Sequence, residues 1–237
     1  MAKCSSSAKG DAHLEPPARD TGKPVEIERP SLRERNKTRK ETAIREAARR
    51  LFVERGYQAT TLREVAEEAD VGFGTVSAYA ADKSGLLAMV FVEELKSLPA
   101  LFARTSQSKD PLDELLVGLG KLYAFWGKIP ALSQHVLQQM EFFAGNPHMD
   151  LIVARRSHSR LELTEWIKRL QDEGKIIADA DPEDAADTLF AIYTSAVREW
   201  SATTPTEVAV GVKRLRRLMK LPMAALTGMA SYGDRTR

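Results

Sequence analysis

Four dipeptides in the last two thirds of the chain mark expected helix starts, because each joins a helix-capping residue to a proline. The cap oxygen accepts a hydrogen bond from a free N–H of the first turn, and proline lacks an N–H that this turn cannot use. The four pairs are Asp110–Pro111, Asn146–Pro147, Asp181–Pro182 and Thr204–Pro205. We therefore expect helices near residues 111–127, 147–173, 182–201 and 205–221.

The remaining segments also show helical periodicity. Apolar residues recur at spacings of three and four, which places them on one helix face; they are Ile44, Ala47, Ala48, Leu51 and Phe52. Thr61 and Glu64 have the spacing of a capping box. The pattern predicts helices near 40–56, 61–70, 74–80, 84–104 and 131–144. No segment shows sustained strand alternation, so the predicted fold class is all-α.

Pro99 lies within the helix expected near 84–104. Proline removes the N–H that would bond the carbonyl four residues earlier, so we expect a kink at this position. A bend in a helix between two domains would provide a hinge, and we state that role as a hypothesis.

Composition excludes several classes of protein. A hydrophobic content of 43% and a charged content of 29% are typical of a globular protein. The net charge of +2 is too small to indicate a nucleic-acid partner by itself. The single cysteine, Cys4, excludes an intrachain disulfide. The most apolar run, residues 85–103, is interrupted by three charged residues, and residues 1–20 lack an apolar signal region. We expect a cytoplasmic protein with no membrane partner.

Both ends of the chain are poor in large apolar side chains. We expect residues 1–32 to be a disordered arm and residues 227–237 a flexible tail. Between them we expect two folded domains, residues 33–83 and residues 84–226.

The helices expected near 61–70 and 74–80 are separated by about four residues that include Gly72. This spacing matches the helix-turn-helix, whose second helix enters the DNA major groove. Tight helical hairpins also occur in proteins that do not bind DNA, so the pattern alone leaves that alternative open.

Residues 42–87 resemble the N-terminal domain of the tetracycline-repressor (TetR) family of bacterial transcriptional regulators. The matching landmarks are Ile44, Ala47, Ala48, Leu51, Phe52, Gly56, Tyr57, Thr60, Thr61, Val65, Ala66, Ala69, Val71, Gly74, Thr75, Tyr79, Lys83 and Leu86. The resemblance implies a homodimeric repressor that binds a palindromic double-stranded DNA operator. A small-molecule effector, bound in a larger helical domain, would release it.

The resemblance also implies which residues contact DNA. Thr61 and Arg63 would face the backbone, the recognition helix would present Thr75, Ser77, Ala78 and Tyr79, and Lys83 would hold a phosphate. Thr61 also has a role as a helix cap, and packing against the first helix is the alternative role for Tyr79. The family usually has glycine at Asp70, a hydroxyl residue at Gly72, an aromatic residue at Ser77, and Phe or Val at Ala80.

A basic run precedes this domain. Residues 33–40 have five basic side chains, Lys37 among them, against Glu34. A basic arm beside a DNA-binding domain adds salt-sensitive phosphate contacts. The alternative is a solvated face without a partner.

Aromatic and methionine side chains are frequent between residues 89 and 166. Ligand pockets are mostly apolar with a few polar groups. The candidate ligand-binding residues are Phe102, Tyr123, Trp126, Gln138, Met140, Phe143, Trp166 and Tyr193, with Gln134, His135 and Arg155 as further polar candidates. These side chains suggest an apolar or aromatic ligand, with a cation as one option.

The helices near 182–201 and 205–221 resemble the dimer-forming pair of the family. The first has a continuous apolar stripe of Ala186, Leu189, Phe190, Tyr193, Val197 and Trp200. The second has a basic face, which we interpret as a solvated flank or as the source of ion pairs across the dimer with Asp184, Asp187 or Glu199.

Enzyme signatures are missing from the sequence. The four histidines show no metal-ligand spacing, and neither a glycine-rich phosphate loop nor a nucleophile elbow occurs. We expect no catalytic activity, no cofactor and no metal. The remaining alternative is a helical ligand-binding or scaffold protein with weakened DNA binding.

Overall fold

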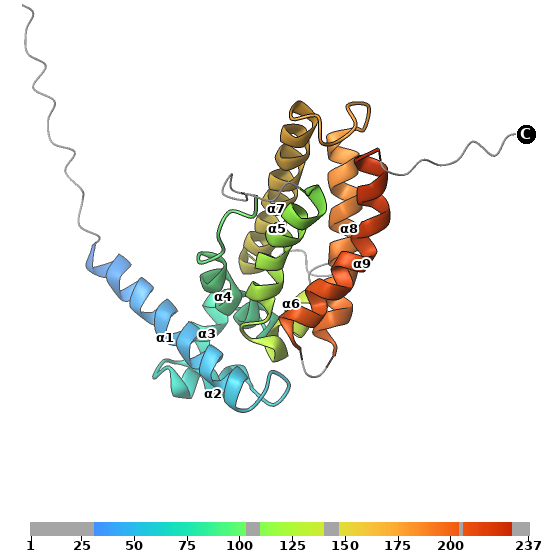
Figure 1. Cartoon of the computed structure of the whole chain (residues 1–237). Helices are drawn as coiled ribbons and strands as arrows, with labels where there is room; N and C mark the ends of the chain where they lie inside the picture. Colours follow the sequence, from blue (N-terminus) through green and yellow to red (C-terminus); the bar gives the residue numbers. More distant parts are fainter. Residues whose placement is uncertain (1–30, 103–109, 140–146, 204–205, 229–237) are drawn as a thin grey trace, which may run out of the picture.

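The computed structural model describes residues 31–102, 110–139, 147–203 and 206–228. Every regular element within these ranges is a helix (Figure 1), so the predicted all-α class is confirmed. The helices are α1 (Leu32–Glu54), α2 (Leu62–Glu68), α3 (Phe73–Tyr79), α4 (Lys83–Leu95), α5 (Pro111–Trp126), α6 (Pro130–Gln139), α7 (Pro147–Asp172), α8 (Pro182–Ser201) and α9 (Val208–Leu226). None of the described helices is both long and apolar enough to cross a membrane.

The predicted caps start two helices as expected. The Asp110 carboxylate accepts a hydrogen bond from the Leu112 N–H at 2.9 Å. The Asp181 carboxylate accepts hydrogen bonds from the N–H groups of Glu183 and Asp184 at 2.8 and 2.9 Å. A proline follows each cap at the first helical turn. α7 also begins at the expected proline, whereas its predicted cap, residue 146, lies outside the described residues.

The predicted start of the last helix is wrong. α9 begins at Val208, after Glu207, whose side chain makes no capping bond. Residues 204–205, the predicted cap and proline, lie outside the described residues. The Trp200 indole N–H donates to the Glu207 carbonyl at 3.0 Å. This contact from α8 holds the first turn of α9 at its observed position, a constraint that local capping rules do not contain.

α1 begins eight residues before the predicted start, at Leu32 rather than residue 40. Ser31 and Glu34 form a capping box, with the Ser31 N–H donating to the Glu34 carboxylate at 2.7 Å. The basic run at residues 33–40 is therefore helical and exposed, not an extended arm. α1 ends at the predicted place, before Gly56, whose φ of 87° is the left-handed conformation typical after a helix.

The kink and hinge predicted at Pro99 are wrong, because α4 ends at Leu95. The chain leaves the helix through tighter turns, in which the N–H groups of Ser97 and Leu98 donate to the carbonyls of Glu94 and Leu95 at 3.0 and 3.1 Å. Proline disfavours helical backbone at the preceding residue, so the helix stops early instead of bending.

The helices pack into two connected groups. α1, α2 and α3 enclose a small core that includes Ile44, Phe52, Val65 and Val76 (Figure 1). α4 contacts both α1 and α7, and α5, α7, α8 and α9 form a bundle. The apolar stripe predicted on the 182–201 helix is buried within this bundle. It therefore packs inside the same chain and is not available to a second copy.

Asp70 occupies a position that favours glycine. Its φ is 51°, in the left-handed region. The Val71 N–H donates to the Ala66 carbonyl at 3.0 Å and the Asp70 N–H to the Glu67 carbonyl at 3.2 Å, which is the Schellman pattern of a helix end. Glycine is usual at this position in the family because any residue with a side chain is strained in the left-handed backbone conformation.

We expect Asp70→Gly to raise the free energy of unfolding by about 1 kcal/mol, because it relieves this strain. Urea denaturation followed by circular dichroism measures the change. The reverse change at another left-handed helix end, Gly56→Asp, serves as the matched control and should lower stability. A less stable Asp70→Gly variant would contradict the assignment.

Candidate nucleic-acid interface and ligand cavity

The helix-turn-helix is held by the capping box of α2. The Thr61 N–H donates to the Glu64 carboxylate at 2.8 Å, and the Glu64 N–H donates to the Thr61 hydroxyl at 3.3 Å. The Thr61 hydroxyl in turn donates to the Glu64 carboxylate at 2.9 Å, and the bonds from the Thr61 N–H and hydroxyl to this carboxylate lower the pKa of Glu64. Arg55 also contacts the Glu64 carboxylate at 3.0 Å. The cap role of Thr61 is present in the structure, and its side chain stays exposed at the start of the helix.

α3 is anchored by its small apolar residues. Val76 is fully buried and Ala80 is 4% exposed, so both face the core of the first three helices. Thr75, Ser77 and Tyr79 are half-buried. The outer face of the helix is formed by exposed Phe73, Gly74 and Ala78.

Phe73 is a surface residue that the sequence reasoning missed. It is 49% exposed, and the Arg63 guanidinium lies 5.8 Å from its ring centroid. A large aromatic residue between two glycines in the first turn of a recognition helix was the available signal.

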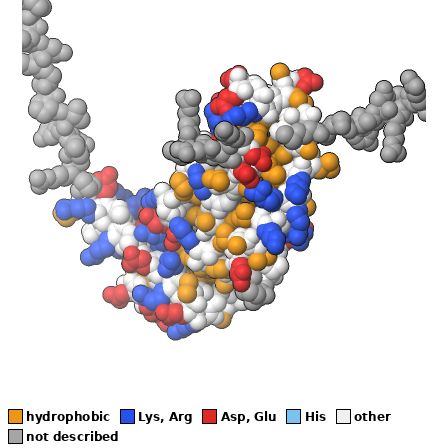
Figure 2. All heavy atoms as spheres, viewed as in Figure 1, with side chains coloured by type: hydrophobic (Ala, Val, Ile, Leu, Met, Phe, Trp, Pro, Cys, Tyr) orange, Lys and Arg blue, Asp and Glu red, His pale blue; other side chains and the backbone are white. Residues whose placement is uncertain are grey.

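A groove separates the outer face of α3 from the basic half of α1. α1 contributes Arg33, Asn36, Lys37 and Lys40, and α3 contributes Gly74, Thr75, Ala78 and Tyr79. The Tyr79 hydroxyl donates to the Lys37 carbonyl at 3.0 Å, which ties the two helices together. Figure 2 shows Lys and Arg side chains over this end of the molecule. The structure thus places a basic wall directly beside the recognition helix.

Lys83, the residue that the resemblance assigns to a phosphate, has contacts within the protein. It is half-buried at the start of α4, where its Nζ donates to the Gln58 carbonyl at 2.8 Å and lies 4.9 Å from the Tyr57 ring centroid. The loop after α1 passes over this lysine, which sequence spacing does not reveal. The ammonium has two further N–H donors, so a phosphate contact stays compatible with this position.

His135 of α6 forms a contact between the two groups of helices. Its ring stacks on Tyr57, with centroids 4.5 Å apart and planes at 31°. Burial lowers the pKa of His135, and the positive charge of Lys83 lowers it further. The histidine is therefore neutral at pH 7 and packs as an apolar ring against the loop that follows α1.

A cavity of about 40 Å³ lies among α4, α5, α6, α7 and α8. It holds about one water molecule, whereas pockets for small ligands measure about 300–1,000 Å³. The cavity is therefore too small in this conformation to hold a ligand of that size. Its lining consists of Leu95, Leu98, Leu122, Phe125, Trp126, Leu137, Ile152, Arg155, Arg156, Ser159, Phe190, Tyr193, Thr194 and Val197.

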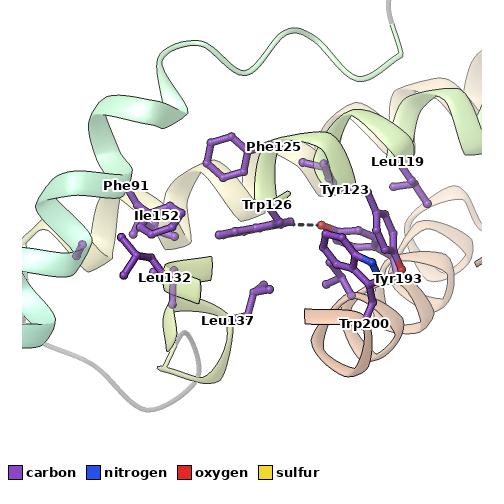
Figure 3. Close-up of a cluster of buried hydrophobic side chains, with 14 of the residues drawn as sticks. Phe91, Leu119, Tyr123, Phe125, Trp126, Leu132, Leu137, Ile152, Tyr193 and Trp200 are labelled. Atoms are coloured by element: carbon purple, nitrogen blue, oxygen red, sulfur yellow. Dashed lines mark hydrogen bonds between the residues drawn. The ribbon is translucent and has the colours of Figure 1, made fainter. Parts of the chain in front are cut away.

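The structure brings two of the predicted ligand-binding residues to this cavity. Trp126 and Tyr193 line it, and the Trp126 indole N–H donates to the Tyr193 hydroxyl at 3.0 Å (Figure 3). Burial raises the pKa of Tyr193, so the phenol stays protonated.

The other predicted residues lie elsewhere. Tyr123 packs against Trp200, with ring centroids 4.9 Å apart, and burial raises the pKa of its phenol. Phe102 packs against Trp166 at 5.2 Å. Gln138 is exposed, which removes it from the cavity lining, and Met140 and Phe143 lie outside the described residues. Gln134 is half-buried on α6, and the polar candidate Arg155 does line the cavity.

Two arginines supply the charge of the cavity lining. Arg155 is paired with Glu162 at 2.9 Å. Arg156 lies 5.8 Å from the Phe190 ring centroid and forms no ion pair with the residues that the structure describes. Positive charge in the lining argues against the cationic ligand that the aromatic residues suggested.

The sequence comparisons agree with this arrangement. Residues 44–90 match the family model described as bacterial regulatory proteins, tetR family. An HTH-type transcriptional regulator of Bacillus subtilis, YhgD, is 25% identical over 167 residues, which are 68% of this chain and 84% of the relative. Residues 44–90 contain α2, α3 and all the groove residues of α3.

Solved structures share the fold. FadR of Thermus thermophilus, a TetR-family repressor solved with lauroyl-CoA, is 24% identical with a TM-score of 0.56, covering 76% of this chain and 92% of FadR. A TetR-family regulator of Pectobacterium atrosepticum is 20% identical with a TM-score of 0.60, covering 84% and 98% of the two chains. The N-terminal domain therefore resembles that of the bacterial regulatory proteins of the tetR family, and the all-helical fold is shared with TetR-family transcriptional regulators.

Proposed function

We propose that the protein is a homodimeric repressor that binds a palindromic operator and is released by a small-molecule effector. Residues 33–83 would form the DNA-binding domain and residues 84–226 the effector and dimer domain. The observation that carries the proposal is the outer face of α3 with the basic turns of α1 directly beside it. A repressor of the same fold, FadR, was solved with a small molecule bound, which supports the effector part.

The DNA contacts divide into two classes. The basic side chains of α1, with Lys37 at the groove, would bind phosphates together with Thr61 and Arg63. Thr75, Ser77, Ala78 and Tyr79 would face base edges in the major groove. Gly74 and Ala78 leave little bulk on this face, so the backbone of α3 can approach the bases closely.

The outer face of α9 supports a dimer. Val210, Leu218 and Leu221 are 57%, 41% and 77% exposed, and their spacing places them on one side of the helix. Large apolar side chains gathered on one face mark an interaction surface. Small exposed residues of α8, Thr188, Ala191 and Ser195, allow a second copy to approach. Glu199 pairs with Arg214 of the same chain, so it would not serve as a partner across the dimer.

α6 would transmit the effector signal. Leu137 lines the cavity, and its carbonyl accepts a hydrogen bond from Arg198 at 3.1 Å. Two residues earlier on the same helix, His135 stacks on Tyr57. A ligand that enlarges the cavity would displace α6 and with it the loop that follows α1. Binding would then shift the population of dimers away from the DNA-competent arrangement.

The function is tested by selecting bound sequences from a random DNA pool with the full-length protein. We expect a palindromic consensus and binding by the dimer in gel shifts at fixed salt concentration. A compound screen for release then identifies effectors. Recovery of no enriched sequence, with the protein folded and dimeric, would contradict DNA binding and favour the helical scaffold alternative.

Tyr79→Ala should weaken operator binding by about tenfold or more, because a base contact is worth about 1–3 kcal/mol. Gel shifts measure the affinity, and circular dichroism checks the fold. Tyr79→Phe serves as the matched control, since it keeps the ring and removes only the hydrogen bond to the Lys37 carbonyl. Operator affinity equal to that of the wild type in Tyr79→Ala would remove this residue from the interface.

Leu221→Asp should convert the dimer to a monomer, because it places a charge within the proposed apolar interface. Light scattering after size-exclusion chromatography measures the mass. Val53→Asp changes an apolar side chain of α1 that is 56% exposed and should leave the dimer intact. A dimeric Leu221→Asp protein would place the interface elsewhere.

His135→Ala should reduce the effect of effector on operator affinity by about fivefold or more, because it removes the ring that contacts Tyr57. Operator affinity is measured with and without saturating effector from the screen. Gln138→Ala, an exposed change on the same helix, is the control. Unchanged coupling in His135→Ala would show that the signal takes another route.

A further inference from the structure

We propose that the effector is an apolar carboxylate whose negative group is bound by Arg156. The inference rests on the proposed function in one respect: it takes the cavity among α4–α8 as the effector site. It adds the chemical class of the ligand and the residue that recognises it.

The two aliphatic hydroxyl groups of the cavity lining already donate to backbone carbonyls, and the phenol of Tyr193 already accepts one hydrogen bond. Ser159 donates to the Arg155 carbonyl at 3.1 Å, and Thr194 donates to the Phe190 carbonyl at 2.8 Å. The Tyr193 hydroxyl accepts the Trp126 indole N–H. The rest of the lining is apolar apart from two arginines. A ligand would therefore be distinguished by its charge more than by a pattern of neutral hydrogen bonds.

The two arginines differ in their partners. The Glu162 carboxylate pairs with Arg155 and also accepts the Leu101 N–H at 2.5 Å, so Arg155 is neutralised and fixed. Arg156 is half-buried, lies over the Phe190 ring, and has no carboxylate partner among the residues of the described ranges. A partly buried cation without a counter-charge is costly, and an anion in the cavity would relieve that cost.

The shape of the guanidinium favours a carboxylate. Its planar fork donates two parallel hydrogen bonds to the two oxygens of a carboxylate. The apolar remainder of the ligand would contact Leu95, Phe125 and Ile152 in the opened cavity. Since the closed cavity measures about 40 Å³, ligand binding must separate the helices around it. This requirement agrees with a regulatory role.

The test uses the full-length dimer and three probes of equal chain length: decanoate, decanol and decylamine. Trp126 lines the cavity, so tryptophan fluorescence can follow binding, with calorimetry as the second measurement. We expect decanoate to bind about tenfold more tightly than decanol, and decylamine more weakly than either, because a charged hydrogen bond adds to the apolar contact. A further binding measurement with decanoyl-CoA distinguishes a free carboxylic acid from an acyl thioester, whose negative charge lies on its phosphates.

Arg156→Met keeps most of the apolar stem over Phe190 and removes the charge. It should abolish the preference for decanoate over decanol while the affinity for decanol stays the same. If decanoyl-CoA binds more tightly than decanoate, the same variant should remove that advantage. Arg160→Met, on the same helix but paired with Asp187, is the matched control and should keep the preference.

Two results would overturn the inference: decanol binding as tightly as decanoate, or an Arg156→Met protein that retains the preference. Ligand binding is measured without DNA, and operator binding of the wild-type protein is measured without ligand. If the wild-type protein binds its operator but shows no preference for decanoate over decanol, this inference alone is refuted. Failure of operator binding refutes the proposed function and leaves the ligand measurement valid.

Discussion

The burial of α4 on all sides is the constraint on which the rest of the structure depends. Its residues from Ser84 to Phe91 are buried without interruption, so the helix has no solvated face over two turns. A helix that is apolar all round must be enclosed by other elements. α1 packs on one side of it and α7 on another, and a single core therefore runs from the helix-turn-helix group into the bundle. α6 also contacts both α1 and α4.

The same packing explains why the cavity is closed. Side chains from five helices meet around Trp126, and interiors close to crystal density leave little space. In the proposed mechanism a ligand would stabilise an open arrangement of the cavity, and it would bind Arg156, which has no carboxylate partner among the described residues. His135 of α6, a helix that lines the cavity, contacts Tyr57 in the loop that follows α1.

Local hydrogen bonding made most helix ends predictable. The caps at Asp110, Asp181 and Thr61 form within three residues of the helix start, so no distant segment is needed to define them. The capping box at Ser31 follows the same rule, and its pattern was present in the sequence although we placed the helix start later. The early end of α4 before Pro99 also has a local cause, the restriction that proline imposes on the preceding residue.

Positions that depend on distant segments were the ones predicted wrongly or missed. Lys83 is half-buried because the loop after α1 crosses over it, and the start of α9 is held by Trp200 of α8. The apolar stripe of α8 is equally compatible with a core or a dimer seam, since periodicity gives the face of a helix but not its partner.

The sequence by itself determined the all-α class, most of the helix caps and the candidate recognition helix, because these depend on hydrogen bonds and spacings within a few residues. Only the tertiary structure decided which apolar faces turn inward, which aromatic residues line the cavity, and which of two adjacent arginines has a carboxylate partner. Those outcomes depend on contacts between residues far apart in the chain, and such contacts form only when the helices pack.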